Sequence, residues 1–294
     1  MTRAFAVEVW SRAFVADENK DAFATRVSAD GSQLRAAVAD GTSATLFSRQ
    51  WADLLVLLAT DGPPRSTDLA ERVDDARAGF DPLVGRLDVH RKVAEKWLLH
   101  GSASTLVSVT GRLTPRGDVH VDAVAAGDSV LIVLDGCTVQ VFPPLGPGDF
   151  GRSPAVIESS PGLPVPLASL AIDAPAEAVF ALATDGAAHP LLRLVERDGA
   201  DATWRCFAEL CADTSTDALE RVLTSFRLGA LDDDATLVLF AATRPARSAR
   251  EALSAHLSSP APAGSDDTDR GSVAKGRWRR LVAFARRLVG HTRV

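Results

Sequence analysis

The sequence predicts an α+β fold in which antiparallel sheets are covered by helices. Apolar strands are grouped along the chain, and so are the helical segments, so the two kinds do not alternate one by one. The chain also carries no glycine-rich phosphate loop, which argues against a doubly wound nucleotide-binding fold. With 294 residues, 46% of them hydrophobic and 24% charged, it has room for one large domain or two small ones and is not a disordered chain.

The N-terminal third predicts three strands and then two helices. Apolar runs bounded by turn residues predict strands at 4–10, 21–27 and 34–39. Apolar residues then recur at helical spacing between Leu46 and Leu58, and Thr42 or Ser43 is the expected cap of that helix. A second helical stretch is expected from about Leu83 to His100.

The rest of the folded region predicts strands first and helices later. Four alternating runs, expected to form an antiparallel meander, lie at 104–113, 119–126, 129–134 and 138–142. Residues 143–166 hold seven prolines and four glycines and are expected to be a long loop. Beyond the loop, strands are expected at 167–172, 179–184 and 235–242, and helical segments at 189–197, 203–211 and 215–227.

The C-terminal part has a different composition. We expect a helical extension at 244–257 and a flexible linker at 258–272, which is rich in Ser, Pro, Ala, Gly and Asp. Residues 273–294 predict a basic amphipathic helix that docks on an anionic membrane surface or an acidic partner, or else packs on the acidic body of the same chain. The segment 272–294 holds seven cations and no acid, so the net charge of −6 leaves −13 on residues 1–271.

These features exclude several classes of protein. An acidic body is not typical of a nucleic-acid binder. No apolar run reaches the ~20 residues of a membrane span, and the N-terminus does not resemble a signal peptide. The three cysteines, Cys137, Cys206 and Cys211, form no CxxC pair and no disulfide framework. We therefore expect a cytoplasmic protein, peripheral to a membrane if the C-terminal helix docks there.

Two of the six Asp-Gly dipeptides stand out by their position. Asp40 and Asp185 each end an apolar strand that leads into helical periodicity, so neither site reads as a hairpin turn. A carboxylate at the end of a buried strand needs a counter-charge, and a metal ion supplies one. A plain turn or a helix cap is the alternative interpretation of each dipeptide.

Further aspartates lie at comparable positions. Asp21 opens a strand, Asp128 lies between two apolar strands, and Asp233 precedes the last strand. Carboxylate oxygens suit hard divalent ions such as Mg²⁺ and Mn²⁺. The histidines and cysteines show no zinc-binding spacing.

In this order, the motifs resemble those of the metal-dependent Ser/Thr protein phosphatases of type 2C, in a divergent bacterial form. The resemblance spans residues 1–243. The matching pieces are Glu18-Asn19-Lys20-Asp21-Ala22-Phe23, Val38-Ala39-Asp40-Gly41, Gly127-Asp128-Ser129, Ala183-Thr184-Asp185-Gly186 and Asp233-Asp234-Ala235-Thr236-Leu237-Val238.

The resemblance implies a four-layer αββα sandwich, two antiparallel sheets flanked by helices, with two Mn²⁺ or Mg²⁺ ions at one edge. By it, Asp40 bridges both ions, the Gly41 carbonyl binds one of them, and Asp185 and Asp233 hold the other. Asp21 binds or orients metal-bound water, and Asp128 helps to hold a weaker third ion. The implied reaction is a direct attack of metal-bound hydroxide on a phosphoester, with Asp21 and Asp40 as the catalytic residues.

The match fails at three places, which involve four residues. Ala16 occupies the place of an arginine that grips the substrate phosphate in the family, and Arg12 is a candidate substitute. Lys20 replaces the acid that usually precedes Asp21; it either binds phosphate itself or repels the second metal. Thr42 and Ser43 replace a Gly-Gly pair.

Three functions remain. The first is a phosphatase acting on Ser/Thr of a phosphoprotein and opposing a partner kinase. The second is a catalytically weak or inactive pseudophosphatase that binds phosphoproteins, with Ala16 and Lys20 as its signature. The third is a peripheral adaptor whose function lies in the 273–294 helix.

Overall fold

The computed structural model describes most of the first 243 residues. The described residues are 3–13, 19–62, 66–84, 101–136, 138–150, 154–213, 215, 217–229, 231 and 233–243. The predicted extension at 244–257, linker at 258–272 and helix at 273–294 lie outside them, as do Ala16 and Cys137.

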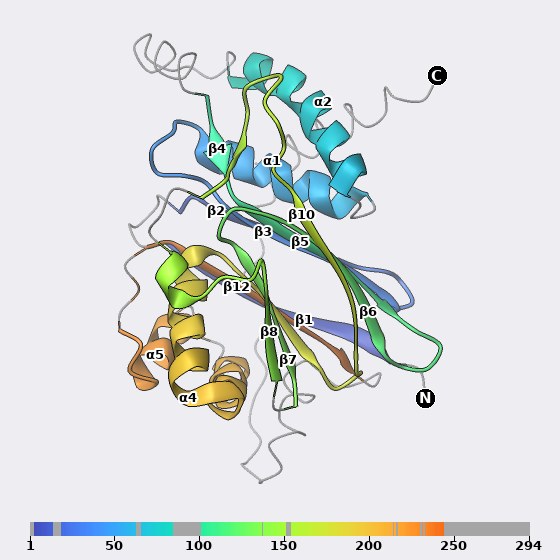
Figure 1. The fold of residues 1–294 in the computed structure, drawn as a ribbon, viewed down its shortest axis with the longest axis vertical. Coiled ribbons are helices and arrows are strands. Elements are labelled where there is room, and N and C mark those ends of the chain that lie inside the picture. The colour runs from blue at the N-terminus through green and yellow to red at the C-terminus, as the bar shows by residue number, and fades with distance from the viewer. Residues whose placement is uncertain are drawn as a thin grey trace.

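Two five-stranded antiparallel sheets pack face to face between two layers of helices (Figure 1). The first sheet has the order β1 (Ala4–Arg12), β12 (Ala235–Thr243), β11 (Val179–Ala183), β7 (Val130–Asp135) and β8 (Thr138–Phe142). The second has the order β10 (Ala168–Ala174), β6 (Val119–Ala126), β5 (Leu106–Leu113), β3 (Gln33–Asp40) and β2 (Asp21–Val27). The helices are α1 (Ser48–Asp61), α2 (Ser66–Val84), α4 (Asp185–Ala212) and α5 (Ala218–Ser225). The predicted α+β class and four-layer αββα sandwich are confirmed.

Three hydrophobic clusters hold the four layers together, because successive residues of a strand point to opposite faces. In β12, Leu237 and Leu239 pack in the cluster beneath α4 and α5, whereas Val238 and Phe240 lie in the cluster between the sheets. A third cluster joins the second sheet to α1 and α2. Both faces of the central strands are therefore buried, which explains their nearly continuous apolar sequences.

Helix α1 begins later than expected. Its N-cap is Phe47, in the left-handed conformation and without a side-chain cap, so the prediction of Thr42 or Ser43 as the cap is wrong. The preceding loop has another role: the Thr42 amide donates to the Ala103 carbonyl, and Gly41 forms a β-bridge with Ser104. The residues after Asp40 therefore pair with the short strand at 103–104, and α1 begins only after them.

Helix α2 was not predicted. Its buried residues Leu69, Val73, Ala76 and Phe80 follow helical spacing, but they are separated by many charged residues. The helix expected at 83–100 overlaps α2 by two residues and otherwise lies outside the described part of the chain. Helical segments expected at 189–197 and 203–211 belong to α4, which departs from helical geometry at Gly199.

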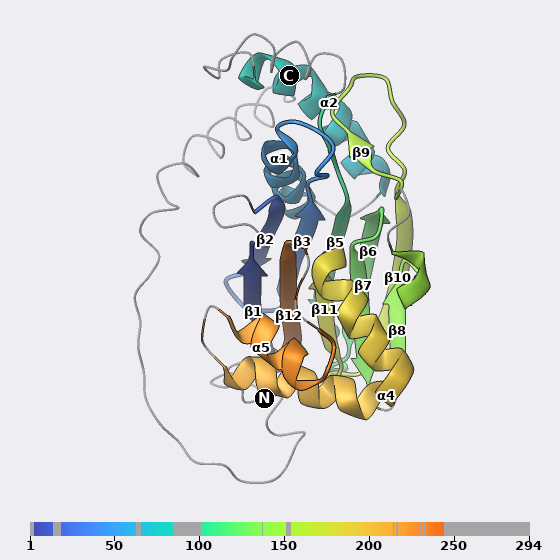
Figure 2. The same cartoon turned by 90° about the vertical axis from the view of Figure 1, so that its left-hand side faces the viewer.

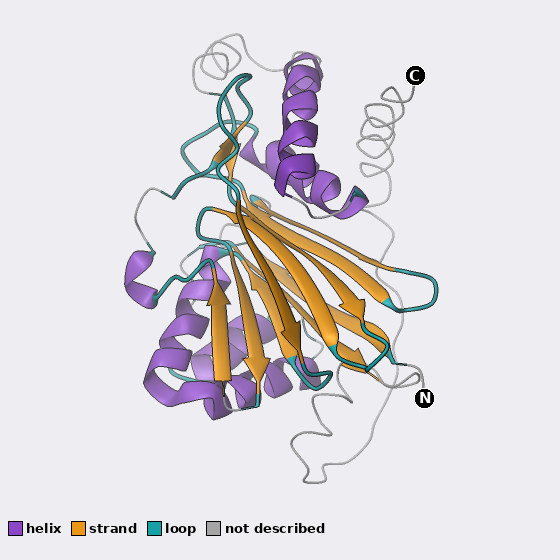
Figure 3. Ribbon diagram, turned by 45° about the vertical axis from the view of Figure 1, so that its right-hand side comes forward, coloured by secondary structure: helices purple, strands orange, loops and turns teal. Residues whose placement is uncertain are grey.

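The four runs between 104 and 142 do not form one meander. β5 and β6 pair in the second sheet, whereas β7 and β8 pair in the first. Figure 3 shows strands of both sheets side by side between the helices. The chain changes sheets between β6 and β7, so the segment that contains Asp128 connects two sheets and is not a hairpin turn.

The long proline-rich segment is anchored on the helical side of the second sheet. It contains a short 3₁₀ helix (Pro147–Asp149) and the strand β9 (Ile157–Glu158), which pairs with β4 (Ala103–Ser104). The Trp51 indole of α1 donates a 2.8 Å hydrogen bond to the Ile157 carbonyl. This part of the segment therefore covers α1 in addition to connecting the two sheets.

The registers place one set of strand ends at the same edge of the sandwich. In the first sheet, the end of β1 pairs with the start of β12, and the end of β11 with the start of β7. In the second sheet, the start of β2 pairs with the end of β3. Figure 2 shows the strands of each sheet next to one another, from β1 to β8 in the first sheet and from β2 to β10 in the second. All five predicted site aspartates lie at or directly beside these strand ends.

Candidate metal centre

Asp21 and Asp40 form the centre of the candidate site. Asp21 is the first residue of β2 and Asp40 the last of β3, and the two are direct partners in the antiparallel ladder. Cross-strand partners project on the same face of a sheet. The two carboxylates are therefore brought together by the register of one strand pair.

Asp21 also connects the two sheets. Its side chain is only 1% exposed, and Oδ2 accepts a 2.7 Å hydrogen bond from the Thr184 hydroxyl at the end of β11. The same hydroxyl accepts a 2.9 Å hydrogen bond from the Thr236 amide of β12. Burial, reinforced by the charges of Asp185 and Asp234, raises the pKa of Asp21 to about 7.

Asp40 is held through its backbone, which leaves the carboxyl group to the site. The Asp40 amide donates a 3.1 Å hydrogen bond to the Thr105 hydroxyl, and the Asp40 carbonyl accepts a 2.7 Å hydrogen bond from the Ser104 hydroxyl. The Thr105 hydroxyl also shares a hydrogen bond with Ser129, the neighbour of Asp128. Burial raises the pKa of the Asp40 carboxyl to about 9, together with the negative charges of the other four predicted ligands, Asp21, Asp185, Asp233 and Asp128.

Both Asp-Gly dipeptides lie where the backbone is crowded. A Cβ atom on Gly186 would come within 2.1 Å of the Asp234 carbonyl oxygen, and one on Gly41 within 2.7 Å of the Ser48 backbone. Asp185 is the first residue of α4, and its Oδ1 accepts a 2.7 Å hydrogen bond from the Gly186 amide. The glycines thus allow the segments that carry Asp185 and Asp40 to approach β12 and α1 closely.

The loop before β12 carries two aspartates with different surroundings. Asp233 is exposed and acts electrostatically on Asp40 and Asp128. Asp234 is 8% exposed, and its Oδ2 accepts a 2.7 Å hydrogen bond from the Lys20 amide. Asp128 is also 8% exposed, and burial followed by the charge of Asp233 raises the pKa of its carboxyl.

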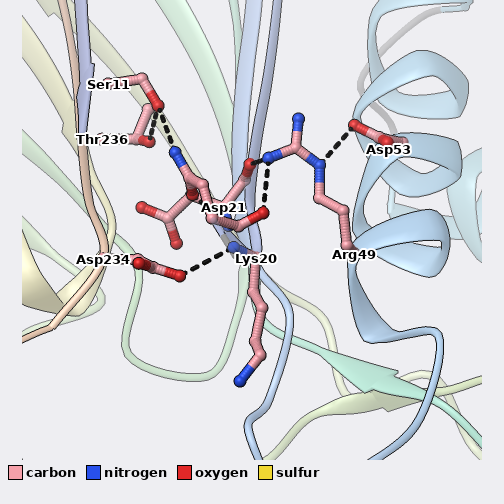
Figure 4. A network of polar contacts seen from close by, with 8 residues as sticks. Ser11, Lys20, Asp21, Arg49, Asp53, Asp234 and Thr236 are labelled. Carbon is pink, nitrogen blue, oxygen red and sulfur yellow. Dashed lines mark hydrogen bonds and ion pairs between the residues drawn. The ribbon is translucent and has the colours of Figure 1, made fainter. Parts of the chain in front are cut away.

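A polar network holds the segment that leads into Asp21 (Figure 4). Asn19 accepts from the Asp21 amide at 2.8 Å and donates to the Ser11 hydroxyl at 3.1 Å. From α1, Arg49 donates to the carbonyl oxygens of Asn19 and Asp21 and is paired with Asp53 at 3.1 Å. The backbone at Asp21 is therefore fixed from β1 on one side and from α1 on the other.

Several members of this network were not predicted as site residues. Thr184 and Thr236 lie within motifs that the sequence singled out, but their hydroxyl and amide contacts join strands that are 52 residues apart in sequence. Arg49 has no sequence signal, because its partners are backbone carbonyl oxygens. The candidate Arg12 does not join the carboxylates, because it forms an ion pair with Glu220 of α5. His189, four residues after Asp185, stacks on Phe150, with ring centroids 5.4 Å apart.

The donor chemistry of this cluster fits a divalent cation. Every candidate side chain offers carboxylate oxygens, and the Asp21 Oδ1 atom is buried without a hydrogen-bond partner in the described structure. Crowded carboxylates with raised pKa values are a set of charges that a cation would neutralise. As the side chains are placed, no three Asp, Glu, His or Cys residues of the described ranges form a group that could hold one ion.

Comparison with solved structures places the fold. The catalytic domain of the serine/threonine protein phosphatase PstP, in complex with two manganese ions, matches with a TM-score of 0.52 and 17% identity, over 82% of this chain and 100% of that one. This chain has the fold of the serine/threonine phosphatases. The S. agalactiae serine/threonine phosphatase matches with a TM-score of 0.53 and 13% identity, over 81% of this chain and 99% of that one. Stp1 from Staphylococcus aureus gives 0.51 and 12%, over 80% and 94%.

The likeness to this phosphatase fold lies in structure and not in overall sequence. No family model matches the chain, and no curated protein matches it. The aspartates of the five motifs nevertheless lie at or beside strand ends of one edge of this fold. None of the helices in the described part of the chain has the length and apolar character needed to cross a membrane.

Proposed function

We propose that this chain is a Mn²⁺- or Mg²⁺-dependent phosphatase that removes phosphate from serine or threonine of a phosphoprotein. The observation that supports it most is the gathering of five strand-end aspartates at one edge of a serine/threonine phosphatase fold, with Asp40 subject to the charge of the other four. Such a concentration of carboxylates, of which Asp21 and Asp128 are buried, opposes folding in the ionised form unless cations bind to it. The presence of two manganese ions in the PstP catalytic domain supports the choice of metal.

In this proposal, Asp40, the Gly41 carbonyl, Asp185 and Asp233 hold two ions, and Asp128 contributes to a weaker third position. Bound divalent cations supply positive charge for the phosphate oxygens and lower the pKa of water. Asp21 orients the attacking water. Its Oδ1 atom, which is unpartnered among the described residues, can accept a hydrogen bond from that water. Thr184 keeps the other oxygen of Asp21 in place.

The test is hydrolysis of p-nitrophenyl phosphate by the full chain with Mn²⁺ and with EDTA. The wild-type protein should turn over only with Mn²⁺, and Asp40→Asn should lose activity by about 100-fold or more, as expected when a group that binds the metal is removed. Asp118→Asn is the control, because Asp118 is exposed in the β5–β6 turn. Activity that survives both EDTA and Asp40→Asn would contradict the proposal.

The second candidate is a pseudophosphatase that binds phosphoproteins. It is favoured by the side-chain placement, in which no three described residues form a metal-holding group, and by the lysine at position 20. It predicts a folded, Mn²⁺-treated protein that binds a phosphopeptide and does not hydrolyse it. The same hydrolysis assay, run beside a phosphopeptide-binding measurement, separates the two candidates.

A further inference from the structure

Backbone contacts fix Lys20 beside the carboxylate cluster. Its amide donates a 2.7 Å hydrogen bond to Asp234, and the next residue is the buried Asp21. The backbone at Asn19 and Asp21, on both sides of Lys20, is held by Arg49. The backbone position from which the Lys20 side chain extends is therefore fixed by the same contacts that place Asp21 (Figure 4).

The side chain of Lys20 reaches the loop that follows Asp40. Its Nζ donates a 3.2 Å hydrogen bond to the hydroxyl of Ser43, an exposed residue three positions after Asp40. No ion pair joins this ammonium group to any carboxylate in the described part of the chain. An ammonium group has three N–H donors, so two remain for another acceptor, and the Ser43 hydroxyl can still donate its own hydrogen.

Among the residues that the structure describes, the two arginines nearest to this segment in the network already have other partners. Arg12 is paired with Glu220, and it shares a strand face with Trp10, which packs in the cluster beneath α4 and α5. This face points away from the space between the sheets, where Ser11 and Thr236 meet. Arg49 donates to two backbone carbonyl oxygens and to Asp53. Both arginines thus have structural partners, and neither is directed at the space between the carboxylates.

We infer that Lys20, together with Ser43, binds the phosphoryl oxygens of a phosphate monoester. This inference rests on the proposed function of the same site. Five carboxylates carry more negative charge than two divalent cations neutralise, so a doubly charged phosphate is still helped by a further positive group. The Lys20 side chain runs from the segment that carries Asp21 to the loop that follows Asp40. Charge-assisted hydrogen bonds from an ammonium group to phosphate are among the stronger ones in proteins.

The same geometry disfavours the alternative in which Lys20 repels a metal ion. The ammonium group donates to the exposed hydroxyl of Ser43, and in the described part of the chain it forms no ion pair with any of the five aspartates. A lysine that served as an internal counter-ion would be paired with one of them. Lys20 instead reaches an exposed residue, Ser43, and is itself partly exposed.

Three properties of the full chain test the inference: Mn²⁺ binding by calorimetry, binding of inorganic phosphate to the Mn²⁺-loaded protein, and kcat and KM for p-nitrophenyl phosphate. For Lys20→Met, we expect KM and the Kd of phosphate to rise about tenfold, the loss of one charge-assisted hydrogen bond, with kcat and the Kd of Mn²⁺ changing less than about threefold. Lys20→Arg should restore most of the phosphate affinity, and Ser43→Ala should give a smaller rise than Lys20→Met. Arg12→Gln is the matched control and should leave phosphate affinity unchanged.

Each outcome decides between the assignments. Unchanged KM and phosphate affinity in Lys20→Met would overturn the inference, and tighter Mn²⁺ binding in that variant would identify Lys20 as a metal-repelling group. A rise confined to Arg12→Gln would assign the phosphate to Arg12. A wild-type protein without turnover that binds phosphate through Lys20 would refute the proposed hydrolysis but support the inference. Turnover that is indifferent to Lys20 would do the reverse.

Discussion

Asp21 and Asp40 are direct partners across the β2–β3 ladder, the first residue of one strand facing the last residue of the other. Two carboxylates in this relationship repel each other, and burial strengthens the effect. When both carboxylates are ionised, the β2–β3 pair therefore carries a destabilising repulsion at the end where Asp21 and Asp40 lie. Three further carboxylates, Asp128, Asp185 and Asp233, lie beside the ends of β7, β11 and β12 at the same edge, so the repulsion is a property of the whole site and has measurable consequences.

The first consequence is a pH-dependent stability of the chain in chelator. The folded-state pKa values of Asp21 and Asp40 are raised to about 7 and about 9, above the value of about 4 in an unfolded chain. Between these limits the folded state binds more protons, so its free energy of unfolding falls as the pH rises. Thermal unfolding in EDTA should give a lower Tm at pH 8.5 than at pH 5.5.

Asp40→Asn should remove much of that slope. At pH 8.5 the Asp40 carboxyl, with a folded-state pKa of about 9, has to take up a proton on folding, and asparagine removes that requirement. With a gain of about 1–3 kcal/mol and a shift of about 2–4 °C per kcal/mol for a domain of this size, Tm at pH 8.5 should rise by about 5 °C. Asp118→Asn should behave like the wild type. An Asp40→Asn protein with the wild-type pH slope would show that the carboxylates do not repel one another.

Mn²⁺ should stabilise the wild-type chain, because an ion that binds only the folded state adds to the free energy of unfolding. At a hundredfold excess over its Kd, the gain is about 2.7 kcal/mol, or roughly 5–10 °C in Tm. The shift should be smaller at pH 5.5, where protons compete for the carboxylates. Differential scanning calorimetry with and without Mn²⁺ measures it, and an equal shift in Asp40→Asn would place the ion elsewhere.

Thr184→Val should destabilise the protein by about 1–3 kcal/mol. The substitution keeps the side-chain shape but removes the hydroxyl that donates to Asp21 and accepts from the Thr236 amide, which leaves two buried polar groups unpaired. Thr184→Ser retains the hydroxyl and is the control. Urea unfolding should rank the wild type close to Thr184→Ser and well above Thr184→Val; equal midpoints for Val and Ser would show that the link between the sheets is not needed.

Gly186→Ala should disturb both stability and metal binding. Its Cβ would lie 2.1 Å from the Asp234 carbonyl oxygen, so the start of α4 and the loop with Asp233 must move apart. We expect Tm to fall by about 5 °C or more and the Mn²⁺-dependent shift to weaken. Gly148→Ala is the matched control, since no atom lies within 4 Å of its Cβ position. Indistinguishable melting curves for the two variants would contradict the close packing at Gly186.

Arg49→Met should loosen the segment that carries Asp21. The guanidinium group donates to the Asn19 and Asp21 carbonyl oxygens, and its loss frees both. We expect hydrogen exchange at the amides of Lys20 and Asp21 to accelerate about tenfold and Mn²⁺ affinity to fall. Arg26→Met, at the opposite end of β2, removes an exposed ion pair with Asp61 and should affect neither. Unchanged exchange at Lys20 and Asp21 would show that the Asn19 side chain suffices.

The sequence determined where most strands begin and end. The expected strands at 21–27, 119–126 and 138–142 have the observed bounds, because alternation of apolar and polar residues and the turn residues beside them are local signals. The position of each candidate aspartate at a strand end follows from the same local pattern. Motif order then led to the phosphatase fold, although the chain shares only 12–17% identity with the structures compared here.

Tertiary structure alone decided which strand ends meet. The runs between 104 and 142 look alike in sequence, yet they divide between two sheets, because pairing depends on partners far away along the chain. Contacts that place Asp21 come from Thr184, 163 residues away, and from Arg49, whose bonds to backbone carbonyl oxygens leave no pattern in the sequence. Local periodicity fixes the ends of a strand, whereas the charge carried by an aspartate there depends on which other carboxylates the packed sheets bring beside it.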